Sequence, residues 1–168
     1  FYIPFVDKVV QQICATNFGD GLGLTPSKAA TITSLGSVFG ANTEITSFNE
    51  LELFTGLKTI NSGAFKSSSI QSVRLSNNVT KIDGSAFYQS SLESINIPPS
   101  VTSLGWGAFR ECKSLVMEEL YLPNLTSNLN GGQFGYGAQI RKVTSLGNIA
   151  VMSETFGGNK LLEMCILP

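Results

Sequence analysis

The sequence predicts a solenoid of stacked repeats, with short parallel strands on one face, turns or short helical turns on the other, and an α-helical cap at its N-terminal end. Three observations support this fold class. An aromatic residue recurs at nearly regular intervals, apolar residues alternate at the start of each repeat, and the first 47 residues instead place apolar residues at helical intervals. Such repeats build a continuous core only by stacking on one another.

The repeats are marked by an aromatic residue that closes each copy. These residues are Phe65, Phe87, Phe109, Phe134 and Phe156. Successive members are 22, 22, 25 and 22 residues apart. Small residues precede the first three, which favours tight packing, so we expect an aromatic row inside the solenoid. Residues 48–168 contain five full copies and a final half-copy.

Each repeat begins with apolar residues at alternate positions, such as Val73 and Leu75 or Ile95 and Ile97. This period of two is typical of a short strand with one buried face. The second half of each repeat places apolar residues three apart, with Gly, Ser and Asn between them. That spacing indicates a turn or one irregular helical turn. Stacking then places the strands in a parallel sheet.

Residues 1–47 are predicted to form the cap, in one continuous domain with the repeats. Apolar residues at helical spacing, including Val6, Val9 and Val10, predict a helix from about Pro4 to Ala15. A second short helix is expected to begin at Pro26, with Thr25 as its N-cap residue. A cap of this kind would cover the end of the core.

Composition excludes several classes of function. The formal net charge is −1, from 11 basic and 12 acidic residues, which gives no electrostatic footprint for nucleic acid. No apolar stretch approaches the roughly 20 residues that span a bilayer, so membrane insertion is not expected. The sequence has no histidine, the commonest general base and metal ligand. We therefore predict no cofactor and no catalytic residues.

The cysteines and the loop after the first helix could each suggest a special site. Cys14, Cys112 and Cys165 match no metal-binding spacing and are expected to be buried thiols, with a disulfide as the less favoured alternative. The loop that contains Asn17 and Asp20 has one acidic residue, Asp20. Calcium requires several oxygen ligands, so a turn is the preferred interpretation and no metal site is predicted.

Strand residues that point away from the core define the candidate binding surface. The predicted inward positions are Leu51/Leu53, Val73/Leu75, Ile95/Ile97, Leu120/Leu122, Val143 and Met164/Ile166. The central outward row is then Glu52, Arg74, Asn96, Tyr121, Thr144 and Cys165. The flanking row is Glu50, Ser72, Ser94, Glu119, Lys142 and Glu163. From these rows the predicted ligand-contact residues on the concave strand face are Glu52, Arg74, Asn96, Tyr121, Lys142 and Thr144. An ordinary solvated face is an equal alternative.

Trp106 occupies a turn position where neighbouring copies carry Ser62, Gly84 and Gly131. Its ring is either partly exposed as a binding anchor or folded against the next coil, and packing is the favoured interpretation.

Two motifs in the central copies carry a family resemblance. Ile97-Pro-Pro-Ser-Val101-Thr-Ser-Leu104-Gly and the following Gly107-Ala-Phe109-Arg-Glu-Cys112 closely resemble BspA-type leucine-rich repeats of bacterial surface proteins. The resemblance is strong over residues 48–109 and weaker beyond them. It implies a curved leucine-rich-repeat solenoid, a location at the cell surface or outside the cell, and adhesion or protein binding. Residues 1–5 lack the features of a signal peptide, so this location rests on the resemblance.

The leading functional prediction is an extracellular or cell-surface adhesion module without catalytic activity. It would bind a protein or glycan ligand, including a host-derived one. The alternative is a structural spacer that displays another domain, and an enzyme acting on glycans or peptides is less favoured.

Overall fold

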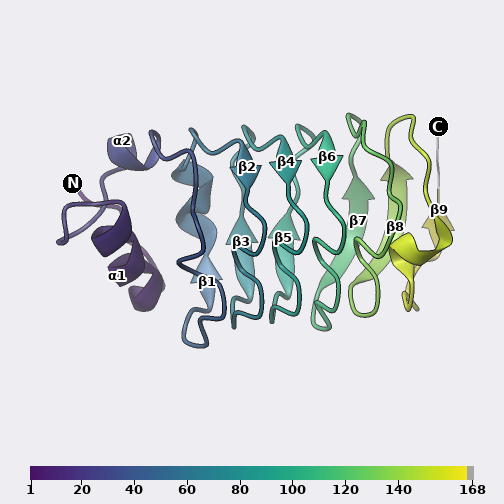
Figure 1. Cartoon of the computed structure of the whole chain (residues 1–168), viewed down its shortest axis with the longest axis horizontal. Coiled ribbons are helices and arrows are strands. Elements are labelled where there is room, and N and C mark those ends of the chain that lie inside the picture. Colours follow the sequence, from purple (N-terminus) through teal and green to yellow (C-terminus); the bar gives the residue numbers. More distant parts are fainter. Residues whose placement is uncertain (166–168) are drawn as a thin grey trace.

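The computed structural model describes residues 1–165 as a row of coils stacked side by side behind a helical N-terminal segment (Figure 1). In chain order the elements are α1 (Lys8–Asn17), α2 (Pro26–Ala29), β1 (Ser47–Phe48), the 3₁₀ helix η1 (Asn49–Leu53), β2 (Thr59–Ile60), β3 (Ser72–Arg74), β4 (Lys81–Ile82), β5 (Ser94–Asn96), β6 (Ser103–Leu104), β7 (Val116–Tyr121), β8 (Gln139–Ser145), the 3₁₀ helix η2 (Ser153–Phe156) and β9 (Met164–Cys165). The predicted fold class, a solenoid with parallel strands and few helices, is confirmed.

The first helix begins later than predicted, at Lys8 instead of Pro4. Asp7 is its N-cap, and the carboxylate oxygen Oδ1 accepts the amide hydrogens of Val9 at 2.9 Å and Val10 at 3.1 Å. This cap fixes the start of the helix, because a capping residue has extended backbone geometry. The preceding residues alternate in burial: Phe5 is buried, whereas Val6 is 75% exposed and does not belong to the helical stripe.

The second helix matches its prediction. It begins at Pro26, and the hydroxyl of Thr25 caps it by accepting the amide hydrogen of Lys28 at 3.2 Å. Among residues 1–165, neither helix has the length and apolar character needed to cross a membrane.

The main sheet of the N-terminal coils pairs β1, β3 and β5 in parallel. Phe48 lies opposite Val73, and Val73 lies opposite Ile95, so these residues occupy one row. The strand predictions around Val73 and Ile95 are therefore confirmed.

The predicted strand at Leu51 and Leu53 is wrong, because these residues lie in the 3₁₀ helix η1. Phe48, Leu51, Phe54 and Leu57 are all buried. Their interval of three is the repeat of a 3₁₀ helix, and Phe48 takes the strand position opposite Val73. Leu53 is 38% exposed, so the apparent alternation of Leu51 and Leu53 does not describe a buried strand face.

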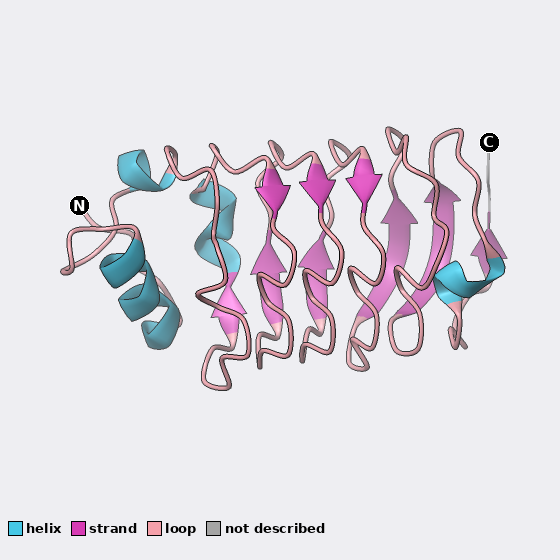
Figure 2. Cartoon of the chain, viewed as in Figure 1, coloured by secondary structure: helices cyan, strands magenta, loops and turns pink. Residues whose placement is uncertain are grey.

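A second parallel sheet, formed by β2, β4 and β6, adds strands to the side where we expected only turns or short helical turns (Figure 2). Ile60 lies opposite Ile82, which lies opposite Leu104, and all three are buried. These strands have only two residues each. They run opposite to β3 and β5 because they form the return path of each coil (Figure 1).

The C-terminal coils form a third sheet of longer strands, β7, β8 and β9. The register between β7 and β8 shifts after Leu120, so Tyr121 lies opposite Ser145 and not Thr144. Between β8 and β9, Val143 lies opposite Cys165, where the predicted register placed Met164. Ile166, predicted as the last inward residue, lies outside the described residues.

The core contains the predicted aromatic spine. The ring centroids of Phe65, Phe87, Phe109, Phe134 and Phe156 follow one another at 5.1, 5.2, 5.3 and 5.8 Å, with interplanar angles between 5° and 15°. Phe39 extends the stack, at 5.4 Å from Phe65, although its position lies within the predicted cap. The boundary between residues 47 and 48 stays a prediction, but the aromatic core begins before it.

Candidate binding surface

A polar hollow of about 430 Å³ joins three of the residues predicted to contact a ligand. It lies beside the C-terminal ends of β3 and β5. The lining residues are Glu52, Thr55, Arg74, Leu75, Ser76, Asn77, Asn78 and Asn96. Most of them offer hydroxyl, amide or charged groups, so the hollow fits a polar ligand.

Glu52 reaches this hollow from η1 and not from the predicted strand. Its Oε2 lies 3.3 Å from Nε of Arg74, with the two side chains 46% and 62% exposed. Glu50, predicted for the flanking row, also lies in η1, and its Oε1 accepts the amide hydrogen of Val6 at 2.9 Å. An exposed ion pair such as that of Glu52 and Arg74 is weak, so Arg74 can exchange it for a partner's carboxylate at small cost.

The side chain of Asn96 makes hydrogen bonds within the fold, which leaves it less available to a ligand. It lies opposite Arg74 in register, as predicted. Its side-chain oxygen accepts the amide hydrogen of Leu75 at 2.6 Å, and its Nδ2 donates to the carbonyl oxygen of Leu75 at 3.0 Å. The amide group thus replaces a pair of backbone hydrogen bonds where the β3–β5 ladder ends. Sequence reasoning had no signal for this bond, because it joins residues in different coils.

Tyr121 and the residues across from it form the aromatic part of the strand face. Tyr121 ends β7 and is 50% exposed. Lys142 lies opposite Glu119 in β8, as the predicted flanking row had it. Thr144 is less available, because its hydroxyl donates to the carbonyl oxygen of Leu120 at 3.4 Å. Tyr121 is therefore an accessible aromatic side chain on the strand face.

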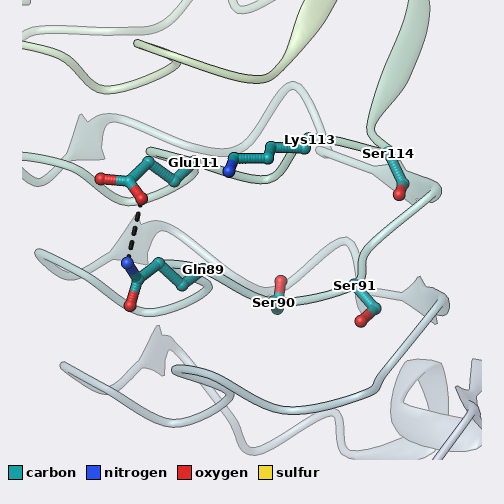
Figure 3. A pocket seen from close by; sticks show the side chains of 6 residues that line it. All are labelled: Gln89, Ser90, Ser91, Glu111, Lys113 and Ser114. Carbon is teal, nitrogen blue, oxygen red and sulfur yellow. Dashed lines mark hydrogen bonds between the residues drawn. The ribbon is translucent and has the colours of Figure 1, made fainter.

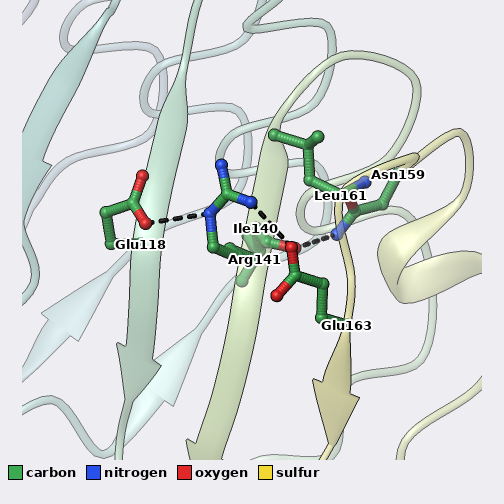
Figure 4. A network of polar contacts seen from close by, with 6 residues as sticks. All are labelled: Glu118, Ile140, Arg141, Asn159, Leu161 and Glu163. Atoms are coloured by element: carbon green, nitrogen blue, oxygen red, sulfur yellow. Dashed lines mark hydrogen bonds and ion pairs between the residues drawn. The ribbon is translucent and has the colours of Figure 1, made fainter.

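The structure adds an ion-pair network of three residues, of which the predicted rows included Glu163 but not Glu118 or Arg141. In β8, Arg141 places Nε 2.9 Å from Oε2 of Glu118 and Nη1 2.7 Å from Oε1 of Glu163 (Figure 4). The three residues are 23 and 22 residues apart, so the repeat length itself could have identified the network. Bonding to Glu163 and Glu118 raises the pKa of the Arg141 guanidinium.

Trp106 is partly exposed and also packs against the next coil. The ring is 54% exposed, and its edge lies over the backbone of Gly131 in the next coil. Arg110 stacks on it, with Cζ 5.3 Å from the ring centroid.

The structure describes the side chains of two of the three cysteines. Cys14 and Cys112 are buried and unpaired. Burial raises the pKa of the Cys14 thiol to about 12 and that of Cys112 to about 11, so both are protonated at neutral pH. The side chain of Cys165 lies outside the described part. Within that part, no three His, Cys, Asp or Glu residues cluster in a way that could hold a metal ion.

Comparison with protein families gives one match. The model of the BspA type leucine rich repeat region matches residues 38–163 in six copies. No curated protein and no solved structure matches the chain. The family match covers most of the sequence, and the stacked coils agree with it. The chain therefore belongs to the BspA-type leucine-rich repeat family.

Proposed function

We propose that this protein is a cell-surface or secreted binding module without catalytic activity, and that it holds a protein partner on the outer face of its strands. The proposal rests on the side chains that this strand face presents. It combines a polar hollow at Arg74 with the exposed ring of Tyr121. Family membership supports a binding role, because repeat solenoids commonly recognise partners over extended strand surfaces.

The side-chain types on this face suit protein recognition. Tyrosine and arginine are enriched among interface residues that contribute most to affinity. Arg74, Asn96 and Tyr121 come from β3, β5 and β7, whose strands follow one another along the solenoid (Figure 1). A partner spanning these strands would contact both anchors.

The test starts by screening the protein against a panel of purified extracellular-matrix proteins. For a partner found there, Arg74→Ala and Tyr121→Ala should each weaken binding by at least about 1 kcal/mol. Lys66→Ala and Lys160→Ala, which alter cations in the turns, serve as matched controls and should have little effect. Calorimetric titration and the thermal midpoint of each variant separate lost contacts from lost folding.

Two outcomes would contradict the proposal. If the turn variants abolish binding and the strand-face variants leave it intact, the contact face is wrong. If no protein in the panel binds, the spacer alternative becomes the better account of the repeats.

A further inference from the structure

A second surface lies in the turns, away from the strand face. Three side chains stack on one another on this surface and stay exposed to solvent. Cζ of Arg110 lies 5.3 Å from the ring centroid of Trp106 and 4.3 Å from that of Tyr136. The two rings are 54% and 53% exposed. We call these three residues the aromatic ridge. Cation–π contacts of this kind hold the rings in fixed positions without burying them.

The backbone of the next coil makes room for the aromatic ridge. A Cβ atom at Gly131 would lie 2.9 Å from Nε1 of Trp106, and one at Gly132 would lie 2.9 Å from Nη1 of Arg110. Real Cβ atoms rarely approach other atoms so closely, so a side chain at Gly131 would push the Trp106 ring aside, whereas the flexible end of Arg110 could move away from one at Gly132. Gly131 therefore leaves the space that the Trp106 ring occupies.

Tyr136 occupies the left-handed position that recurs two residues after each spine phenylalanine. Its φ is 62°, in the left-handed region that glycine enters without cost. The equivalent residues of the other coils, Ser67, Gln89, Glu111 and Gly158, are left-handed as well. The coil therefore fixes the backbone of Tyr136, whose amide donates to the carbonyl oxygen of Gly157 at 2.6 Å, and places its ring against Arg110.

A polar hollow adjoins the aromatic ridge. The amide of Gln89 donates to the carbonyl of Arg110 at 3.1 Å, and the amide of Glu111 donates to that of Gly135 at 3.0 Å. Gln89, Glu111 and Tyr136 thus occupy one row on successive coils, which are about 4.8 Å apart.

This hollow measures about 330 Å³ and is lined by Gln89, Ser90, Ser91, Glu111, Lys113 and Ser114 (Figure 3).

Glu111 connects the hollow with the ridge. Its carboxylate accepts hydrogen bonds from Nε2 of Gln89 at 2.9 Å and from the hydroxyl of Tyr88 at 3.1 Å. Nε of Arg110 lies 3.9 Å from the same carboxylate. The polar groups beside the rings are therefore already oriented.

We propose that the aromatic ridge and the adjoining hollow form a carbohydrate-binding site. A pyranose ring would stack its C–H face on Tyr136, with Trp106 nearby, and hydroxyl groups would bond to Glu111, Gln89 and Lys113. Flat exposed rings beside a few fixed polar groups suit such a ligand. Arg110 and Lys113 place two positive charges beside the carboxylate of Glu111, so the local charge admits neutral and carboxylated sugars but is far below what nucleic acid needs.

The protein carries its own probe for this site, because Trp106 is its single tryptophan. The test titrates the protein with neutral hexasaccharides (gluco-, xylo- and chito-oligomers) and with an anionic one, oligogalacturonate, while tryptophan emission is recorded. We expect a saturable change with at least one of them. Lys113→Gln should weaken the anionic sugar more than the neutral ones, because glutamine keeps a hydrogen-bond donor for hydroxyl groups and loses the positive charge.

The decisive variant is Tyr136→Gly, since glycine accepts the left-handed backbone and removes only the ring. It should lower sugar affinity at least tenfold while the thermal midpoint stays level or rises. Tyr121→Ala removes an equally exposed tyrosine from the strand face and should leave sugar binding unchanged.

The carbohydrate proposal is overturned if no sugar in either arm changes the emission, or if Tyr136→Gly binds as well as the unaltered protein. Neither result bears on the strand-face proposal, which is tested with protein partners and with Arg74→Ala and Tyr121→Ala.

Discussion

Residues with left-handed backbone geometry recur at fixed positions of each coil. One position lies two residues before the spine phenylalanine and holds Gly63, Ser85, Gly107 and Gly132. The second position lies two residues after the spine phenylalanine. The backbone amide of the residue there donates to the next coil. The amide of Ser67, for example, donates to the carbonyl oxygen of Tyr88 at 2.8 Å. These residues turn the chain around the aromatic core and link neighbouring coils.

Ser85 is the one non-glycine residue among the four at the first position, with φ of 58°. Ser85→Gly should therefore stabilise the protein by about 0.5–1 kcal/mol, because relief of the left-handed strain exceeds the added chain entropy of glycine. Urea unfolding would measure the change.

The control is the reverse kind of substitution, from glycine to alanine, at the equivalent position of another coil. A Cβ atom at Gly63 would meet nothing closer than 4.0 Å, so Gly63→Ala changes backbone strain alone. It should cost about 1 kcal/mol. Equal stabilities for both variants and the unaltered protein would contradict this account.

At the scale of elements, the aromatic spine supplies the most regular packing. Phe87 lies between two neighbours, with ring centroids at 5.1 and 5.2 Å. Phe87→Ala or Phe109→Ala should each cost about 3–5 kcal/mol, because each leaves a cavity in a row that the surrounding coils cannot close. Chemical denaturation tests this, with the exposed Tyr121→Ala as the control. A cost below about 1 kcal/mol at either spine position would mean that the spine contributes little.

The loop after α1 is the second element with a testable property. Oδ2 of Asp20 accepts the hydroxyl hydrogen of Tyr2 at 2.6 Å, and Oδ1 accepts the amide hydrogens of Leu22 and Gly23, each at 3.0 Å. The carboxylate is thus engaged by the protein's own donors, and it is the loop's one acidic side chain. Millimolar calcium should leave the thermal midpoint unchanged, because a ligand stabilises only what it binds. A rise of several degrees that Asp20→Ala abolishes would contradict this expectation.

The elements also show what a single sequence can and cannot predict. The spine and the strands at Val73 and Ile95 were predictable, because every copy repeats the same burial. The helix η1 was not, since Leu51 and Leu53 satisfy a period of two and only Phe48 and Phe54 reveal the period of three.

Within the site, the exposed Arg74 and Tyr121 followed from the register. The hydrogen bonds between Asn96 and Leu75 and the register shift at Tyr121 depend on contacts between coils, which no local sequence pattern encodes.

At the scale of the molecule, a solenoid's coils contact only their neighbours, so the contact between the N-terminal segment and the first coil affects the whole stack. Asp7 makes this contact. Its Oδ1 caps α1, while its Oδ2 accepts the amide hydrogens of Thr46 at 2.6 Å and Ser47 at 3.2 Å and the Thr46 hydroxyl at 3.0 Å. One buried carboxylate therefore holds the cap helix against β1.

Burial alone would raise the pKa of Asp7, but the hydrogen bonds from Thr46, Val10 and Ser47 outweigh it and hold the pKa below its ordinary value of 3.8. A carboxylate whose pKa is lowered by folding stabilises the native state fully above the pKa of the unfolded chain, near 4. That stabilisation is lost as the pH falls through the folded pKa.

Asp7→Asn should therefore lower the free energy of unfolding by about 2–3 kcal/mol at pH 7, because the neutral amide accepts these hydrogen bonds poorly and offers donors to other donors. The difference from the unaltered protein should narrow below about pH 4, where Asp7 of the unfolded chain becomes protonated, and should be lost as the pH falls through the lower pKa of the folded protein. Urea unfolding from pH 2 to pH 7 measures it. Asp83→Asn, which removes only the surface ion pair with Lys81, should cost less than about 1 kcal/mol across that range. A penalty for Asp7→Asn that stays constant with pH would show that the side chain's shape, and not its charge, holds the cap to the coils.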